Sequence, residues 1–193
     1  NLNLEKSVAN LKSRNIFKSV KSEVLEGSSA DLKIINININ EKPTGEISAG
    51  AGVGTNGGTL AFTITENNWL GEGKKVALDF ELTAESLKGM FTYTNPNYDL
   101  LGNSIQYSLT NTTNDKPDQG YENSIVGFGI GTGFEQYNNV FATLGLNLSH
   151  DDLKTDSTAS DSLKKQKGQF TELAANYGFS YDLRNRSFMP TDG

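Results

Sequence analysis

Glycines at positions 52, 54 and 57 give one segment the spacing of a dinucleotide-binding loop, G-x-G-x-x-G. That chemistry needs a strand before the loop and a helix after it, because the helix N-terminus holds the pyrophosphate. Here residues 59–65 follow with apolar side chains at every second position, which indicates a strand. The sequence therefore predicts a glycine-rich strand that leads into a hairpin loop, and no bound cofactor.

Few other residues could support catalysis or bind a metal. His150 is the only histidine, and the chain has no cysteine, which excludes disulfides and thiolate metal sites. His150 opens a polar stretch, so we expect a solvated loop histidine. Asp79 and Glu81 point the same way on one strand and could do acid–base work, but charges that face water are the simpler interpretation. The basic run 164–167 fits a solvated loop, and we expect no catalytic residue and no metal.

Composition narrows the function classes. The 193 residues include 17 Lys and Arg against 23 Asp and Glu, for a net charge of -6. Nucleic-acid binding needs a basic surplus, so we expect no nucleic-acid partner. No run of about 18 apolar residues is present, which excludes a transmembrane helix. The chain begins at Asn1 without a signal peptide and stops at Gly193, so we interpret it as a piece of a longer protein.

The N-terminal part has its own pattern. Apolar residues over 4–17 fall on one helical stripe, which predicts a short amphipathic helix. Two strand-like stretches follow at 18–25 and 32–40, and the segment 41–45 then interrupts the chain with Pro and Gly. We therefore expect a small α/β unit over residues 1–44 and a β domain over residues 45–193.

The β domain contains eight segments in which apolar and polar or small residues alternate, and no convincing helix. The segments are 47–54, 59–65, 76–83, 90–95, 105–110, 126–134, 140–149 and 172–181. Most approach the length of about nine to eleven residues with which a tilted strand crosses a bilayer. Alternation alone fits two folds, because a soluble sandwich buries its apolar face whereas a membrane barrel turns that face to lipid.

The connections favour the membrane barrel. Every second connection is compact and carries apolar or aromatic residues, namely Trp69, Leu70, Tyr98, Tyr137 and Phe188. The others are polar, and we expect two of them, 111–123 and 150–168, to be long loops. Short turns at one end and long loops at the other are typical of outer-membrane barrels. The aromatic residues at the short turns fit an interfacial girdle.

Several segments together resemble the BamA-type outer-membrane assembly family, in which POTRA modules precede a β-barrel. Asn10-Leu11-Lys12-Ser13 with Ile16-Phe17, then Glu41-Lys42-Pro43-Thr44-Gly45 and a glycine-alternating strand, resemble the junction between the last POTRA module and the barrel. Segments 66–73 and 94–98 resemble the first two periplasmic turns, and 176–178 with 188–193 resemble the fourth. The resemblance covers nearly the whole chain apart from the two long polar loops.

The resemblance implies a mainly β fold, an antiparallel transmembrane β-barrel of about sixteen strands. The chain would carry about the first eight, after a partial POTRA module. It also implies a non-enzymatic function, the assembly and insertion of β-barrel proteins into the bacterial outer membrane, with the POTRA part in the periplasm. The implied partners are unfolded outer-membrane protein clients, outer-membrane lipid, and accessory lipoproteins that bind through the POTRA region.

The same resemblance assigns a role to the first barrel strand. In the family this strand pairs weakly with the last one and leaves a lateral seam for a client's strand. The positions here are Glu46, Ile47, Ser48, Ala49, Gly50, Ala51, Gly52, Val53 and Gly54. Unpaired backbone groups cannot stay bare in lipid, so pairing with a client satisfies both edges. Small side chains would keep this edge unobstructed, or they would merely fit the lumen.

Three other functions stay open. One is a related POTRA–barrel secretion or translocation pore for a dedicated partner protein, which the number of upstream POTRA modules would distinguish. Another is a passive porin-like barrel, which would not need the helix and hairpin before residue 46. The last is a soluble β-rich binding domain, which would melt cooperatively without detergent.

Overall fold

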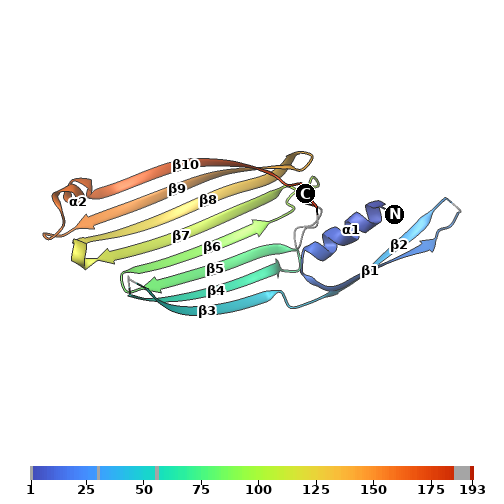
Figure 1. Ribbon diagram of the computed structural model, residues 1–193, viewed down its shortest axis with the longest axis horizontal. Coiled ribbons are helices and arrows are strands. Elements are labelled where there is room, and N and C mark those ends of the chain that lie inside the picture. Colours follow the sequence, from blue (N-terminus) through green and yellow to red (C-terminus); the bar gives the residue numbers. More distant parts are fainter. Residues whose placement is uncertain (1, 30, 55–56, 185–191) are drawn as a thin grey trace.

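The computed structural model describes residues 2–29, 31–54, 57–184 and 192–193. A helix and a hairpin come first, and eight long strands follow with two short helical segments among them (Figure 1). The elements are α1 (Leu2–Ser13), β1 (Phe17–Glu26), β2 (Lys33–Glu41), β3 (Gly45–Gly54), β4 (Gly57–Trp69), β5 (Lys74–Thr83), β6 (Ser86–Asn95), β7 (Ser104–Lys116), η1 (Pro117–Gln119), β8 (Tyr121–Tyr137), β9 (Val140–Thr155), α2 (Asp161–Gln166) and β10 (Gly168–Tyr181).

The helix α1 packs beside the antiparallel hairpin β1–β2. It ends at Ser13, earlier than the sequence pattern predicts, because Asn15 takes a left-handed conformation with φ of 56°. The Asn15 amide donates to the Lys12 carbonyl at 3.2 Å, which closes the last turn. Ile16 and Val20, 5% and 7% exposed, are the buried apolar side chains of this unit among the residues described. Neither α-helix described here has the length and apolar character needed to cross a membrane.

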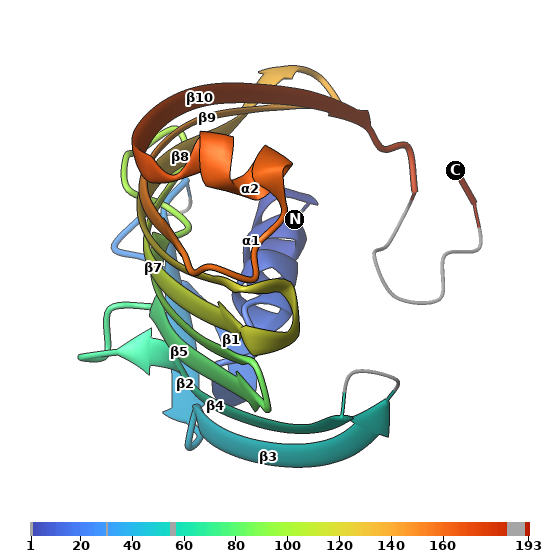
Figure 2. The same cartoon turned by 90° about the vertical axis from the view of Figure 1, so that its left-hand side faces the viewer.

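The strands β3 to β10 form one antiparallel sheet in which each strand pairs with its neighbours in sequence. The predicted count of eight strands is confirmed. Viewed from the end, the sheet bends into an arc whose open side lies between β3 and β10 (Figure 2). In the described chain, each of these two strands is paired along one side only. The mainly β, antiparallel barrel-type fold predicted from the sequence is confirmed.

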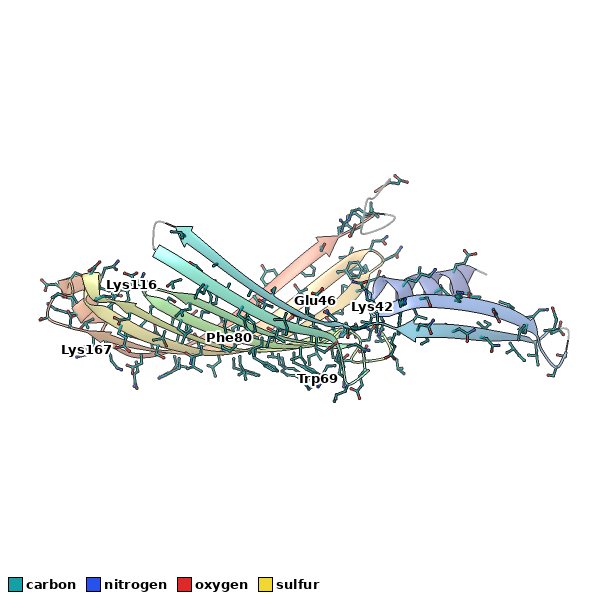
Figure 3. All side chains as sticks on the ribbon, turned by 90° about the horizontal axis from the view of Figure 1, so that it is seen from below. Lys42, Glu46, Trp69, Phe80, Lys116 and Lys167 are labelled. Atoms are coloured by element: carbon teal, nitrogen blue, oxygen red, sulfur yellow. The ribbon has the colours of Figure 1, made fainter. Side chains whose placement is uncertain are left out.

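The two faces of the sheet differ in polarity. Strand register places Ile64, Leu78 and Phe91 side by side, and the same face continues with apolar residues to β10. Many of these side chains are exposed: Ile47, Leu60, Phe80, Leu82, Leu109, Phe128, Leu146, Leu148, Leu173 and Tyr177. Trp69 projects from the convex side of the sheet (Figure 3). A curved sheet that exposes a continuous apolar face and turns its polar face inward is inverted relative to a soluble sandwich.

A stripe of glycines lies on the concave face where β8, β9 and β10 meet. A Cβ atom on Gly129 would lie 2.5 Å from the Ser108 hydroxyl and 2.7 Å from Asn147 Oδ1. A Cβ on Gly145 would lie 2.6 Å from Asn176 Oδ1. Asn147 Nδ2 in turn donates to Asn176 Oδ1 at 3.1 Å. Glycine is needed here because polar side chains of the neighbouring strands lie across it on the crowded inner side.

The structure corrects the two predicted long loops. Residues 111–116 continue β7, residues 121–123 begin β8, and only the short η1 turn separates them. Residues 150–155 likewise continue β9, and the remaining connection contains α2, although no helix was expected in this part of the chain. Most strands are also longer than predicted, up to 17 residues in β8. The polar ends lack an apolar period, yet their backbones still pair.

At this end of the sheet, the connections contact one another. Lys116 forms an ion pair with Glu85, and the Asp115 amide donates to the Glu85 carbonyl at 2.8 Å. The Asp156 amide donates to the Gly120 carbonyl at 2.9 Å, so the β9–β10 connection contacts the β7–β8 turn. Ala159 is buried, with 4% of its surface exposed. The β5–β6, β7–β8 and β9–β10 connections therefore form one packed cluster.

Candidate functional site

The strand β3 is an edge strand that pairs with β4 from Gly45, opposite Glu66, to Gly54, opposite Gly57. Every residue of β3 is exposed, with Ile47 at 73% and Val53 at 93%. In the part of the chain described, no strand covers the other edge of β3. A bare edge presents a row of backbone donors and acceptors, which is a template for another strand.

The glycines of β3 differ from those of the concave stripe. A Cβ atom on Gly50, Gly52 or Gly54 would meet no described atom within 4 Å. Packing within the described chain therefore does not require glycine at these positions, whereas it does require glycine at Gly129 and Gly145. The small residues of β3 leave its inner side open and make the strand intrinsically weak, since glycine in a strand contributes no side-chain packing.

Thr44, directly before β3, is held by the last residues of β4. Its carbonyl accepts from the Asn67 amide at 3.3 Å and from Asn67 Nδ2 at 3.1 Å. Its hydroxyl donates to Glu66 Oε1, and the same carboxylate oxygen accepts from the Asn68 amide at 2.7 Å. Asn68 Oδ1 accepts from the Gly73 amide at 2.7 Å, which closes the turn. The end of β4, together with the β4–β5 turn, therefore fixes the chain where it enters β3.

The α/β unit reaches the same place. The space beside Gly73 is bounded by an Arg14 guanidinium nitrogen at 3.2 Å and by the buried Ile16 at 3.8 Å, both measured from a Cβ built on the glycine. Lys42 donates from its amide to the Ile16 carbonyl at 3.3 Å and from Nζ to Asn15 Oδ1 at 2.7 Å. Three segments meet here, residues 14–16, 42–44 and 66–73, and we call them the junction.

The predicted interfacial residues lie at the same end of the sheet as the junction. Trp69 and Leu70 are 45% and 79% exposed at the β4–β5 turn, Tyr98 is 50% exposed at the β6–β7 turn, and Tyr137 is 70% exposed at the end of β8. Leu70 takes a left-handed conformation, with φ of 57°. Phe188 lies outside the described residues. Contact of these side chains with a membrane interface stays a prediction.

The other sequence candidates do not form a reactive site. His150 lies within β9 rather than in a loop, where its Nδ1 is 3.0 Å from Thr171 Oγ1. Asp79 accepts from the Thr63 hydroxyl at 2.7 Å on the polar face, which also carries Glu81. The basic run lies at the end of α2, where Lys164 donates to the Ser157 carbonyl at 2.9 Å. The described residues contain no group of three His, Cys, Asp or Glu able to hold a metal.

Residues 68–193, which make up the greater part of the sheet, match the family model of the Omp85 superfamily domain. The chain belongs to the Omp85 superfamily. This membership confirms the resemblance drawn from the sequence motifs, and it indicates the bacterial outer membrane as the location.

A likeness in fold to one solved structure also extends over the N-terminal unit. The solved structure of BamA from Haemophilus ducreyi lacking POTRA domains 1-3 is similar, with a TM-score of 0.73 at 23% sequence identity. The alignment covers 98% of this chain and 40% of that one, so the present chain spans less than half of that structure's length. At this identity the likeness shows a common fold.

The junction is the feature that sequence reasoning missed. Residues 66–73 and 41–45 were each singled out as motifs, but nothing in the sequence connects them. Thr44 and Glu66 are 22 positions apart and meet only because β3 and β4 form a hairpin. The signal that could have found them is the hairpin itself, because pairing that begins at Gly54 and Gly57 brings the outer ends of both strands together at Gly45 and Glu66.

Proposed function

We propose that this protein, as part of an Omp85-type barrel, assembles and inserts β-barrel proteins into the outer membrane without enzymatic chemistry. The proposal rests on β3. It is an edge strand, and packing within the described chain does not require glycine at its glycine positions. Such a strand can release one partner and accept another at low cost, since few side-chain contacts are lost. Its residues 46–54 form the client-pairing seam.

The partners follow from this role. Unfolded outer-membrane protein clients pair with β3, and membrane lipid covers the convex apolar face. The α/β unit lies in the periplasm as part of a POTRA module and binds accessory lipoproteins. Trp69, Leu70, Tyr98 and Tyr137, with Phe188, anchor the sheet at the periplasmic interface. A pore that secretes a dedicated partner protein is the second candidate, and the junction suits it equally, because both functions need a periplasmic module fixed to the barrel.

Photo-crosslinking tests the seam in the full-length protein. A photoreactive residue replaces Ser48 on β3, and the matched control replaces Thr92, which lies on the same polar face of the interior strand β6. We expect a stalled outer-membrane client to crosslink at position 48 and not at position 92, because β6 is paired along both edges. Equal crosslinking at both positions would refute pairing at β3. Crosslinks to one dedicated secreted protein alone would favour the secretion pore.

A further inference from the structure

The convex face is hollowed over the strands β7 to β10. A groove of about 610 Å³ lies there, and nonpolar atoms form most of its surface. The residues that line it include Tyr98, Ile105, Thr132, Ala175 and Tyr177. Tyr98 comes from the β6–β7 turn, so one end of the groove reaches the end of the sheet that carries the junction.

Strand register explains the hollow. One row across the sheet reads Ile105, Thr132, Leu144 and Tyr177, and the next reads Ile130, Leu146 and Ala175. Thr132 and Ala175 are the small members of rows that are otherwise bulky. Between these rows lies the backbone of Gly131 and Gly145, which are paired and whose Cβ positions point to the concave face. The groove is therefore a consequence of two small residues, Thr132 and Ala175, placed among bulky neighbours on the convex face.

The polar residues inside the groove have partners elsewhere. Asn176, which also lines it, accepts at Oδ1 from Asn147 Nδ2 at 3.1 Å on the concave face. The Thr132 hydroxyl donates to the Ser104 carbonyl at 2.8 Å and is thereby satisfied. No Asp, Glu, Lys or Arg lines the groove among the described residues. It is continuous with the apolar face that Omp85 membership places against lipid. A flexible hydrocarbon chain fits such a surface, because it gains dispersion contacts on several sides where a flat wall gives contact on one.

We propose that this groove holds one acyl chain of a phospholipid, with Tyr98 beside its headgroup region. The choice of phospholipid rests on the proposed function, which puts the Tyr98 end of the sheet at the periplasmic leaflet. Tyrosine suits that position, since its ring is apolar and its hydroxyl is polar. The bound chain exchanges more slowly than lipid against the rest of the apolar face.

The test is native mass spectrometry of the full-length protein released from bilayers that contain phosphatidylethanolamine and lipopolysaccharide. Ala175→Trp fills the groove, and this exposed position has room for the larger side chain. The control is Leu109→Trp. The Leu109 side chain lies on the same face outside the groove and is 53% exposed. We expect the wild type and Leu109→Trp to retain one phosphatidylethanolamine, and Ala175→Trp to lose it.

Equal retention by all three proteins, or retention of lipopolysaccharide in place of phospholipid, would overturn the groove proposal. Vesicle flotation separates this outcome from failure of the proposed function. If all three proteins float with the vesicles but bind lipid alike, the groove is wrong and the membrane barrel stands. If the wild type does not float, the result contradicts the proposed function, and the phospholipid site that rests on it is contradicted as well.

Discussion

The carboxylate of Glu66 holds the start of β3 in place through a hydrogen bond from the Thr44 hydroxyl, and a second bond, from the Asn68 amide, fixes the carboxylate itself. We predict that Glu66→Ala loosens residues 42–44, which join the α/β unit to β3, because a hydrogen bond to a charged acceptor contributes about 1.5–3 kcal/mol. The distance between spin labels at positions 21 on β1 and 75 on β5 should become more widely distributed in the full-length protein. Double electron–electron resonance measures that distribution.

The matched control for this experiment is Glu72→Ala. Glu72 lies in the same segment of the junction, residues 66–73, and forms an ion pair with Lys74, but that contact does not involve residues 42–44. We expect Glu72→Ala to leave the distance distribution as it is in the wild type. If the two variants broaden it equally, the turn as a whole is responsible and Glu66 has no special role at the junction.

Asp156 gives the packed loop cluster a dependence on pH. Hydrogen bonds from the Thr158 hydroxyl at 2.6 Å and the Thr158 amide at 2.7 Å lower the pKa of Asp156 below its ordinary 3.8. A lowered folded-state pKa stabilises the cluster above the unfolded-state value, and this contribution is lost as the pH falls through the folded-state value. We predict that a spin label at position 165 keeps one mobility from pH 8 to about 5 and loosens only below about 4.

Asp156→Asn provides the comparison for that titration. The neutral amide cannot take the ionised form, so the variant should show greater label mobility than the wild type at neutral pH and little change on acidification. A wild-type label that loosens near pH 6 would point to another titrating group and would count against Asp156.

At the level of the strand, alanine substitutions at two glycines separate a position where glycine is sterically required from one where it is not. Gly129→Ala puts a methyl group 2.5 Å from the Ser108 hydroxyl, whereas Gly50→Ala meets nothing within 4 Å. We predict that Gly129→Ala lowers the free energy of unfolding by about 1–3 kcal/mol through overpacking. Gly50→Ala should change it by less than about 0.5 kcal/mol. Urea titration of the full-length protein in vesicles measures both, and equal values would contradict a special role for the concave stripe.

The strand pattern could be predicted where one face contacts an apolar medium. Segments such as 76–83 alternate because register places Leu78 and Phe80 on the exposed apolar face and Asp79 on the polar one. The alternation of apolar and polar residues stops at the polar ends of the strands, beyond the apolar face. Asn114 and Asn123 pair across β7 and β8, and Asn114 Nδ2 donates to Asn123 Oδ1 at 2.9 Å. Backbone pairing continues there with polar residues on both faces, so hydropathy carries no signal.

The helix α2 was missed for a related reason. It has only six residues, too few to show a 3.6-residue period. Its local signal is Ser160, whose hydroxyl accepts from the Leu163 amide at 3.3 Å as an N-cap. The positions of the candidate seam residues on an edge strand were predictable from chain order, but the contacts at the junction were not, because they depend on the relative positions of three segments.

At the scale of the whole molecule, the open edges and the apolar face have one common consequence. The sheet is unpaired at β3 and β10 in the described chain, and its convex side exposes large side chains from nearly every strand. Few apolar residues are buried: Ile16, Val20, Ala142 and Ala159 among those described. Hydrophobic burial within the chain therefore contributes little to holding the sheet in water, and the surrounding medium must supply it.

We therefore predict that residues 1–193 expressed alone do not form a stable monomer in plain buffer. Exposed strand edges and a large apolar surface both favour association between copies, through edge pairing and through burial of the convex face. Light scattering after size exclusion should show aggregates, and circular dichroism should show no cooperative melt. Detergent micelles should raise solubility by covering the apolar face, although the edges β3 and β10 would still pair between copies. A monomer that melts cooperatively without detergent would contradict the membrane-barrel interpretation and would restore the soluble binding domain.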